Sequence, residues 1–440
     1  MTARWIQRPA TNNTHGHMKQ DSTASETGSS DRRADPPTAD SDGHPGWRVT
    51  LAVMWPAQLF CIMGFSFVMP FLPFYVRDLG VSERMVPVWS GLLITGAGLT
   101  QSIMGPVWGY VADRYGRKPM VQRAMFGGAV VLTLMGFVTS VHQLLALRVL
   151  QGAVTGTVPA SIALISSVVP QARLGFSLGL IQMAVFSGGS IGPYLGGIVA
   201  DHFGYRVPFG VTGALLFTGG ILVLLGARER FVRPDPREQA SSAPWRQILR
   251  ARGLMMLLAV FFLMNLSSSL VAPIFPLFVE EIVGGAERAA TETGLLLAIT
   301  GIAAAFAAVM TGRLSDRLGY KNMLVAATAF AGLIGIPHAA AHTLWQLALL
   351  RLLFGLAAGG MIPAMNAMVA QIIPRDRLGQ AYGFTTTASA LGFATGPAIG
   401  GWAAAILGYR VPFVIMGVML LALALVQRRG LQARGSEEQG

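Results

Sequence analysis

The sequence predicts an all-α membrane protein, in which twelve transmembrane helices form two six-helix halves of similar sequence. Three observations predict this fold class. Only 12% of the 440 residues are charged and 52% are hydrophobic, whereas a soluble domain carries about 25% charged residues. Apolar segments of roughly 20 residues, the length that crosses a bilayer, recur along the chain. The second half of the chain repeats the pattern of the first.

The apolar segments define the expected helices in chain order. Because the bilayer core offers no water to backbone groups, each spanning segment must be helical. The predicted spans of the first half are 49–72, 87–109, 119–139, 144–168, 175–200 and 207–227. Those of the second half are 254–279, 292–312, 323–341, 345–372, 379–406 and 411–427.

Polar segments divide the chain into five parts. We expect a disordered cytoplasmic tail over 1–46, a six-helix bundle over 47–227, a basic cytoplasmic linker over 228–252, a second six-helix bundle over 253–427 and a cytoplasmic tail over 428–440. The first tail is rich in Ser, Thr, Asp, Pro and Gly, and it lacks the apolar core of a signal peptide.

The net charge of +12 arises in the loops between apolar segments, so it does not indicate a nucleic-acid partner. Alternate loops carry most of the arginines and lysines, and by the positive-inside rule these loops face the cytoplasm. Both termini are therefore expected on the cytoplasmic side of a bacterial inner membrane. The single cysteine, Cys61, excludes an intrachain disulfide, and no residue pattern predicts a metal or another cofactor.

Corresponding positions of the two halves carry identical residues. Arg148 recurs as Arg351, 203 residues later, and the segment GYRVPF at 204–209 recurs at 408–413, 204 residues later. Such a repeat predicts two bundles related by an axis along the membrane normal, with a substrate site between them at mid-membrane. Rocking of one half against the other would expose that site to each side in turn, as a transporter requires.

A short charged loop follows the second predicted helix of each half. Its residues are Gly109, Asp113, Arg114, Gly116, Arg117 and Lys118 in the first copy, and Gly312, Asp316, Arg317, Gly319 and Lys321 in the second. The glycines allow a tight turn and close backbone approach. An aspartate beside cations can hold this side shut through charge-assisted contacts. The loop resembles the signature of the major facilitator superfamily, which implies a conformational gate. A plain positive-inside anchor is the alternative.

The fifth and eleventh predicted helices both carry the pattern GxxxGPxxGG. Its residues are Gly188, Gly192, Pro193, Gly196 and Gly197, and then Gly392, Gly396, Pro397, Gly400 and Gly401. Glycines at four-residue spacing allow close helix packing, and the proline bends the helix. The first copy resembles the antiporter motif of the drug/proton antiporters in that superfamily, which implies export. Ordinary helix packing would produce the same pattern.

Three residues are candidates for proton coupling. Arg148, Gln151 and Gly152 resemble the fourth-helix motif RxxQG of the superfamily, which links the arginine to coupling. An arginine at the bilayer centre costs roughly 2.5–3.5 kcal/mol, so Arg148 should face an aqueous path or polar partners, or snorkel to the outer interface. No predicted span contains a carboxylate at its middle. Asp78 and His338 are therefore the other candidates, with a purely structural role as the alternative for His338.

Amide and aromatic side chains are candidates for a substrate cavity, because such side chains suit varied apolar ligands. The candidates are Gln58, Phe65, Gln151, Gln182, Phe186, Asn265, Phe354 and Asn366. Each of them would equally well fill a helix interface.

Over residues of about 47 to 430 the chain resembles a twelve-helix major facilitator transporter of the drug/proton antiporter type, similar to bacterial multidrug and tetracycline exporters. The resemblance implies a monomer in the lipid bilayer that exports small apolar or amphipathic compounds in exchange for protons and confers antibiotic resistance. A metabolite carrier for a sugar, amino acid or siderophore and a non-transporting receptor remain alternatives. The absence of a GxxxxGK[ST] loop disfavours an ATP-driven pump, and composition excludes a soluble enzyme.

The two loop copies differ, because Tyr320 and Asn322 replace an arginine and a proline of the first copy. We therefore predict that Asp113→Asn removes most transport, whereas Asp316→Asn removes less. Drug resistance of cells that express each variant at matched protein levels measures the difference. Equal losses would show that the sequence difference between the two loops does not affect transport.

Overall fold

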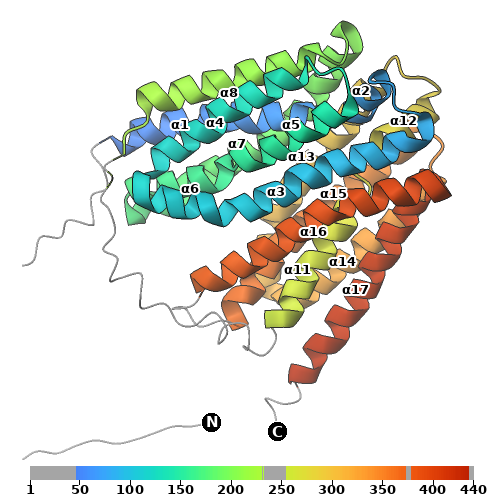
Figure 1. Cartoon of the computed structure of the whole chain (residues 1–440). Coiled ribbons are helices and arrows are strands. Elements are labelled where there is room, and N and C mark those ends of the chain that lie inside the picture. The colour runs from blue at the N-terminus through green and yellow to red at the C-terminus, as the bar shows by residue number, and fades with distance from the viewer. Residues whose placement is uncertain (1–45, 230, 232–253, 373–377, 436–440) are drawn as a thin grey trace, which may run out of the picture. The chain divides into compact units, whose positions relative to one another are not determined.

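The computed structural model describes residues 46–229, 231, 254–372 and 378–435 (Figure 1). Within these ranges it does not describe the side chains of 312–318, 370, 372, 378–380 and 430–435. Residues 1–45 of the tail expected over 1–46, most of the linker expected over 228–252 and residues 436–440 lie outside the described part of the chain. All described residues belong to one unit, Ser41–Gly440.

The helices of the first half follow one another along the chain with short connections. They are α1 (Trp47–Phe67), α2 (Leu72–Asp78), the 3-10 helix η1 (Glu83–Met85), α3 (Val86–Tyr115), α4 (Arg117–Met135), α5 (Val141–Val154), α6 (Thr157–Val168), α7 (Gln171–Phe203) and α8 (Val207–Gly226).

The second half repeats this order of α-helices except that its fourth long helix is unbroken, and its 3-10 helix follows the third long helix instead of preceding the second. Its elements are α11 (Leu254–Ser269), α12 (Phe275–Val283), α13 (Ala289–Leu318), α14 (Tyr320–Gly335), the 3-10 helix η2 (Ile336–Ala340), α15 (Leu344–Ile372), α16 (Leu378–Leu407) and α17 (Val411–Gly435).

The described residues confirm the predicted fold class. Nine helical segments are long and apolar enough to cross a membrane, with α5 and α6 counted as one segment. The helices α3, α4 and α11 stand at the positions of the second, third and seventh predicted spans. Together they account for all twelve predicted helices. The last helix continues to Gly435, beyond the end expected at 427.

Three predicted spans are interrupted. The seventh of the twelve breaks between α11, which ends at Ser269, and α12, which starts at Phe275. The first ends at Phe67, and the separate helix α2 starts at Leu72 with Pro73 in its first turn. The fourth breaks between α5 and α6 at Gly156, whose φ of 119° belongs to the left-handed region that glycine adopts readily. Proline and glycine at these points favour a new helix start over continuation.

Side chains satisfy two carbonyl groups at the break between α5 and α6. The indole of Trp108 donates to the Ala153 carbonyl at 2.6 Å, and Arg123 donates to the Thr155 carbonyl at 3.4 Å. Arg123 also lies 3.5 Å from the centre of the Trp108 ring. Because a spanning segment has no water for its free carbonyls, these donors make an interrupted helix tolerable.

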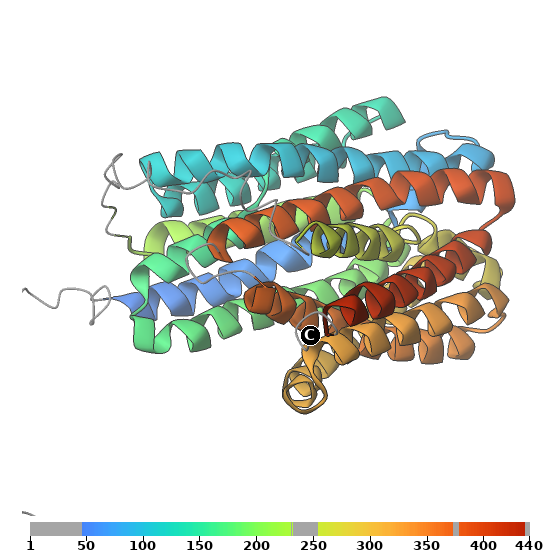
Figure 2. The same cartoon turned by 90° about the horizontal axis from the view of Figure 1, so that it is seen from below.

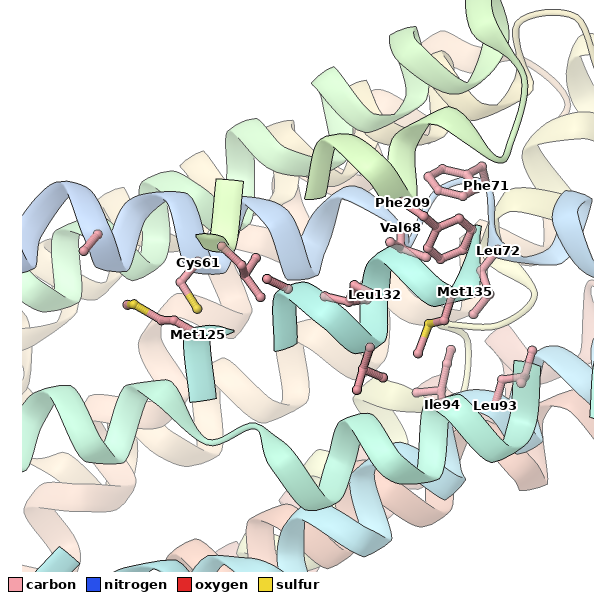
Figure 3. Packing of buried hydrophobic residues seen from close by; sticks show 14 of the residues in the cluster. Cys61, Val68, Phe71, Leu72, Leu93, Ile94, Met125, Leu132, Met135 and Phe209 are labelled. Carbon is pink, nitrogen blue, oxygen red and sulfur yellow. The ribbon is translucent and has the colours of Figure 1, made fainter. Parts of the chain in front are cut away.

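Each half has a hydrophobic core with aromatic rings at corresponding positions, and the core of the first half extends to Leu277, Ala289 and Ala290 of the second half. In the first half Phe209 lies 5.5 Å from Phe71 and 5.1 Å from Tyr75, measured between ring centres. Figure 3 shows Phe71 and Phe209 beside Leu72 and Met135. In the second half Phe413 lies 5.0 Å from Phe278. Both clusters pack against α2 or α12, so these short helices mark the same end of each half.

Two pairs of helices join the halves. The helix α3 packs along α16, and α7 packs along α13 (Figure 1 and Figure 2). We call the end of the molecule that carries α2 and α12 the α2/α12 end. The opposite end, which carries the α3–α4 turn at Gly116, is called the turn end.

Candidate functional site

The halves meet through their main chains at the α2/α12 end. A Cβ atom at Gly197 of α7 would overlap the Ala290 carbonyl of the second half, and one at Gly401 of α16 would overlap the Pro87 carbonyl of the first half. These two contacts occupy equivalent positions of the repeat. Only residues without a side chain permit so close a crossing.

The prolines of the GxxxGPxxGG motifs take part in the same crossings. The carbonyl of Pro193 faces Gly294 of α13, and the carbonyl of Pro397 faces Gly91 of α3. The two copies of the motif therefore make equivalent contacts between the halves.

The other glycines of the motif point into their own half. Gly188, Gly192 and Gly196 lie against the main chain of α1, from Leu59 to Phe67. In the second half Gly392, Gly396 and Gly400 lie against α11, from Phe262 to Leu270. Each motif thus gives its helix two faces without side chains, one for its own half and one for the partner half.

The halves diverge toward the turn end. Nothing among the described residues lies within 4 Å of a Cβ built at Gly105 or Gly109 of α3, Gly175 or Gly179 of α7, or Gly383 of α16. The same three helices are in main-chain contact at the α2/α12 end. In this conformation Gly109 therefore makes no close backbone approach, and the space between the halves widens toward the turn end.

The first charged loop is fastened to the end of α8. Gly116 has a φ of 102° and separates α3 from α4. The carboxylate of Glu229 accepts from the Arg117 amide at 2.8 Å and 3.0 Å and from the Lys118 amide at 2.8 Å. Lys118 Nζ donates to the carbonyls of Leu224 and Ala227 at 3.0 Å and 2.7 Å. An acid thus caps the start of α4 and a base caps the end of α8.

The remaining loop residues have fewer described contacts. Asp113 and Arg114 are exposed on the last turn of α3. Gly319 has a φ of 82° and makes the equivalent turn between α13 and α14, and Lys321 is half-buried. Gly312, Asp316 and Arg317 lie in the part of α13 whose side chains are outside the described residues.

Arg148 is buried in the first half, with 3% of its surface exposed. Its guanidinium donates to Gln151 Oε1 at 3.1 Å, while Nε and Nη2 find no partner among the described residues. Its repeat equivalent Arg351 is also buried, with its guanidinium 3.6 Å from the centre of the Phe275 ring. Both arginines therefore lie inside the protein rather than at a lipid-facing surface.

His338 lies in the core of the second half and not on a face between the halves. It is fully buried in η2, its ring stacks on Phe413 at 5.6 Å, and its Nδ1 is 2.8 Å from the Ile334 carbonyl. This placement gives it a packing role in the present conformation.

Asp78 ends α2, and its side chain is exposed. Partial desolvation raises the pKa of its carboxyl, and the positive charges of Arg206 and Arg77 oppose that rise. Among the three coupling candidates, it is the one that solvent reaches directly.

The expected cavity residues separate into two groups. Gln58 is buried inside the first half, where its Oε1 accepts from Ser161 at 2.7 Å, and Phe354 is buried beside His338. Gln151 is held by Arg148. These three were expected to line the cavity, but they lie within a half. The amides of Gln58 and Gln151 are stable there because each has an internal hydrogen-bond partner.

The other candidates are less buried. Gln182 and Phe186 are exposed on α7. Their spacing places them on the helix face of Pro193 and Gly197, which meets α13 nearer the α2/α12 end. Asn366 is exposed on α15, and Phe65 and Asn265 are half-buried.

Among the described residues, three polar links also cross between the halves. The Ala398 amide of α16 donates to Thr95 Oγ1 of α3 at 3.1 Å, and the other two links use charged side chains. Arg77 of α2 pairs with Glu280 of α12 through two contacts of 2.7 Å and 2.8 Å. This bond raises the pKa of the Arg77 guanidinium. Asp201 Oδ2, at the end of α7, accepts from the amide and the hydroxyl of Thr291 at 2.8 Å and 2.6 Å. Sequence reasoning missed these links and also Glu229.

Glu229→Gln should release the first loop, because a neutral amide offers the α4 start weaker hydrogen bonds than a carboxylate does. We predict that the amide hydrogens of Arg117 and Lys118 exchange roughly tenfold faster, as measured by hydrogen–deuterium exchange. Glu287→Gln, an exposed glutamate elsewhere, serves as the control. Unchanged exchange in Glu229→Gln would mean that the carboxylate does not hold the loop.

Comparison with known proteins identifies the family. The family model of the Major Facilitator Superfamily matches residues 54–338 and 260–430. The chain is 33% identical over 398 residues to the multidrug resistance protein MdtG of Enterobacter lignolyticus, covering 90% of this chain and 95% of the relative. It is 33% identical over 399 residues to the protein of the same name from Salmonella typhimurium, covering 90% and 98%.

Solved structures share the fold at low sequence identity. A bacterial homolog of the human lysosomal transporter Spinster, in an inward-facing and occupied conformation, has a TM-score of 0.75 at 15% identity and covers 88% of this chain and 97% of its own. The human organic anion transporter MFSD10 has a TM-score of 0.63 at 18% identity, covering 87% and 100%. With the family model and the curated relatives, they give one conclusion: this chain belongs to the Major Facilitator Superfamily.

Proposed function

We propose that this chain is a multidrug exporter, which moves small apolar or amphipathic compounds out of a bacterial cell in exchange for protons. The observation that carries the proposal is how the halves meet. At the α2/α12 end, Gly197 lies against the Ala290 carbonyl and Gly401 lies against the Pro87 carbonyl, whereas the halves diverge toward the turn end. Relatives at 33% identity over 90% of the chain bear the name multidrug resistance protein.

The positive-inside rule orients the proposed exporter. The turn end carries the arginine- and lysine-rich loops and faces the cytoplasm in this proposal, with both termini on that side. The present conformation is then closed toward the outside and open toward the cytoplasm. An exporter must load its substrate in such a state. Release requires the contacts at the α2/α12 end to break while the turn end closes.

At the turn end, the loop residues supply the second gate in this proposal. Glu229 and Lys118 fix the loop to α8, so that α3 and α4 move with the rest of the first half. Asp113 stays free to make charge-assisted contacts when the halves approach at this end. The proposed gate residues on the second loop are Gly312, Asp316, Arg317, Gly319 and Lys321.

The proposed substrate surface lies between the halves on the turn-end side of the glycine crossings. Gln182 and Phe186 present an amide and an aromatic ring along one face of α7, and Asn366 adds a second amide. Phe65 and Asn265 border this surface in the proposal. Aromatic and amide groups without fixed charge suit apolar and amphipathic compounds.

Proton coupling in this proposal uses Arg148 and Asp78. In this proposal the unpaired N–H donors of Arg148 bind an acceptor group of an entering substrate, which reorganises the buried pair with Gln151, and the carboxylate of Asp78 takes up and releases the proton. The energy suffices, because one charge crossing 100 mV yields about 2.3 kcal/mol. One pH unit adds roughly 1.4 kcal/mol. Together they sustain a substrate gradient of a few hundred fold. His338 takes no part in the proposed coupling, because it is buried in the core of the second half.

A transport assay in inverted membrane vesicles tests the proposed function. Energising the vesicles with a proton gradient should accumulate fluorescent drugs inside them, and an uncoupler should abolish this accumulation. The same chain should raise the drug tolerance of a pump-deficient host. No accumulation of any compound in a chemically broad panel would refute export. Accumulation that survives the uncoupler would remove proton antiport.

Gly197→Val and Gly401→Val should each abolish most transport, because a branched side chain would collide with a carbonyl of the partner half. We expect losses of similar size, since the two contacts are equivalent. Gly210→Val, on α8, which takes no part in the crossings between the halves and where a Cβ meets open space, is the control and should keep most activity. Normal drug efflux by Gly401→Val would show that the second motif copy is dispensable.

A further inference from the structure

The ion pair between Arg77 and Glu280 joins repeat-equivalent positions of the two halves. The two residues are 203 positions apart, the same offset that relates Arg148 to Arg351. Each half thus presents the same structural position to the other half, and the two copies carry opposite charges. Positions related by a two-fold axis meet only at that axis, so the pair lies at the centre of the α2/α12 end.

The geometry of the pair is that of a strong charged contact. Both terminal nitrogens of Arg77 reach separate carboxylate oxygens of Glu280, at 2.7 Å and 2.8 Å. The side chains are 28% and 18% exposed, so solvent screens them only in part. Arg77 Nε binds Glu83 of its own half at 2.8 Å, which holds the guanidinium in place. Two-fold bonding of this kind adds geometric specificity to charge attraction.

A neighbouring ion pair shows what an internal contact at the same end looks like. Glu281 follows Glu280 in α12 and pairs with Arg410 at 3.1 Å. Both partners belong to the second half, and both are more exposed, at 34% and 43%. Rocking of the halves would break the Arg77–Glu280 pair and leave the Arg410–Glu281 pair unchanged. The chain therefore contains its own matched control.

The polar link between the halves through Asp201 is one-sided. Asp201 binds the start of α13 through Thr291, but the equivalent positions on α16 and α3 hold Ala405 and Val88. The α3–α16 crossing thus has no counterpart of this carboxylate. The bond from the Ala398 amide to Thr95 likewise belongs to one crossing. Among the polar links of the described residues, the Arg77–Glu280 pair is the one that joins equivalent positions and is placed to hold both crossings closed equally.

We propose that Arg77 and Glu280 form a charge latch that stabilises the conformation closed at the α2/α12 end. They are positioning residues, which touch no substrate and act through the equilibrium between the two conformations. The consequence for transport rests on the proposed function: a weaker latch lowers the fraction of protein in the loading state. The apparent substrate affinity then falls, so KM rises, while opening toward the outside becomes easier.

Cysteine accessibility measures the conformation without relying on transport. Ser190→Cys places a thiol where the Ser190 hydroxyl faces Gly301 across the halves, and the residue is 5% exposed in the closed end. A background of Cys61→Ser removes the natural thiol. Purified protein in nanodiscs is treated with a water-soluble maleimide, which reaches both faces of the membrane. Opening of the α2/α12 end exposes the thiol and raises the labelling rate.

Glu280→Gln should raise the labelling rate roughly tenfold, a coupling of ordinary size between two conformations. Glu281→Gln should leave the rate unchanged, because its pair lies within one half. The triple variant Arg77→Glu, Glu83→Gln, Glu280→Arg exchanges the two charges and removes the repulsion from Glu83. It should return the rate toward that of the parent, since the two positions are equivalent across the axis.

Three outcomes would overturn the latch: equal labelling in Glu280→Gln and the parent, equal increases in Glu280→Gln and Glu281→Gln, or no recovery in the exchanged variant. Failure of the proposed function looks different. If the chain accumulates no drug in vesicles but labelling responds to Glu280→Gln and recovers on charge exchange, the latch stands and the export proposal falls. If the vesicles accumulate drug but the labelling rate is the same in Glu280→Gln and the parent, the export proposal stands and the latch falls.

Discussion

Two helix crossings at which a glycine of one half lies against the main chain of the other half are the constraint on which the rest of this structure depends. Main chains of α7 and α13 meet at Gly197 and Ala290, and those of α16 and α3 meet at Gly401 and Pro87. Because lipid is as apolar as the helices, close packing rather than burial from water must hold the halves together. In the proposed exporter, these contacts between main chains form the interface that opens during transport.

The second structural theme is the placement of charge at the ends of helices. Glu229 and Lys118 cap facing helix ends at the turn end, whereas Arg77, Glu280 and Asp201 bridge the halves at the other. Between these two levels the described spans contain no carboxylate. Among the described residues, contacts that involve a carboxylate are thus confined to the two ends, whereas the polar contacts inside the spans, such as those of Gln58 and Gln151, use amides, hydroxyls and a guanidinium.

The sequence predicted the features that leave a regular pattern. Twelve apolar segments, the repeat and its fold class are confirmed. The faces of the helices were not predictable, because a membrane helix is apolar all round and its periodicity does not separate core, cavity and lipid. For this reason Gln58 and Phe354 were predicted to line the cavity, although both lie inside a half. The role of Glu229 was not predicted, because it stands between Arg228 and Arg230 in an arginine-rich stretch that is typical of a solvated segment.

The Arg77–Glu280 pair carries a consequence for the origin of the chain. In a symmetric dimer of one short ancestor, the position now held by both residues would face its own copy, and like charges would oppose each other. Opposite charges at this position require two copies that mutate independently. The pair therefore postdates the duplication that the sequence repeat records, and it marks a contact that two identical copies of one half would not make.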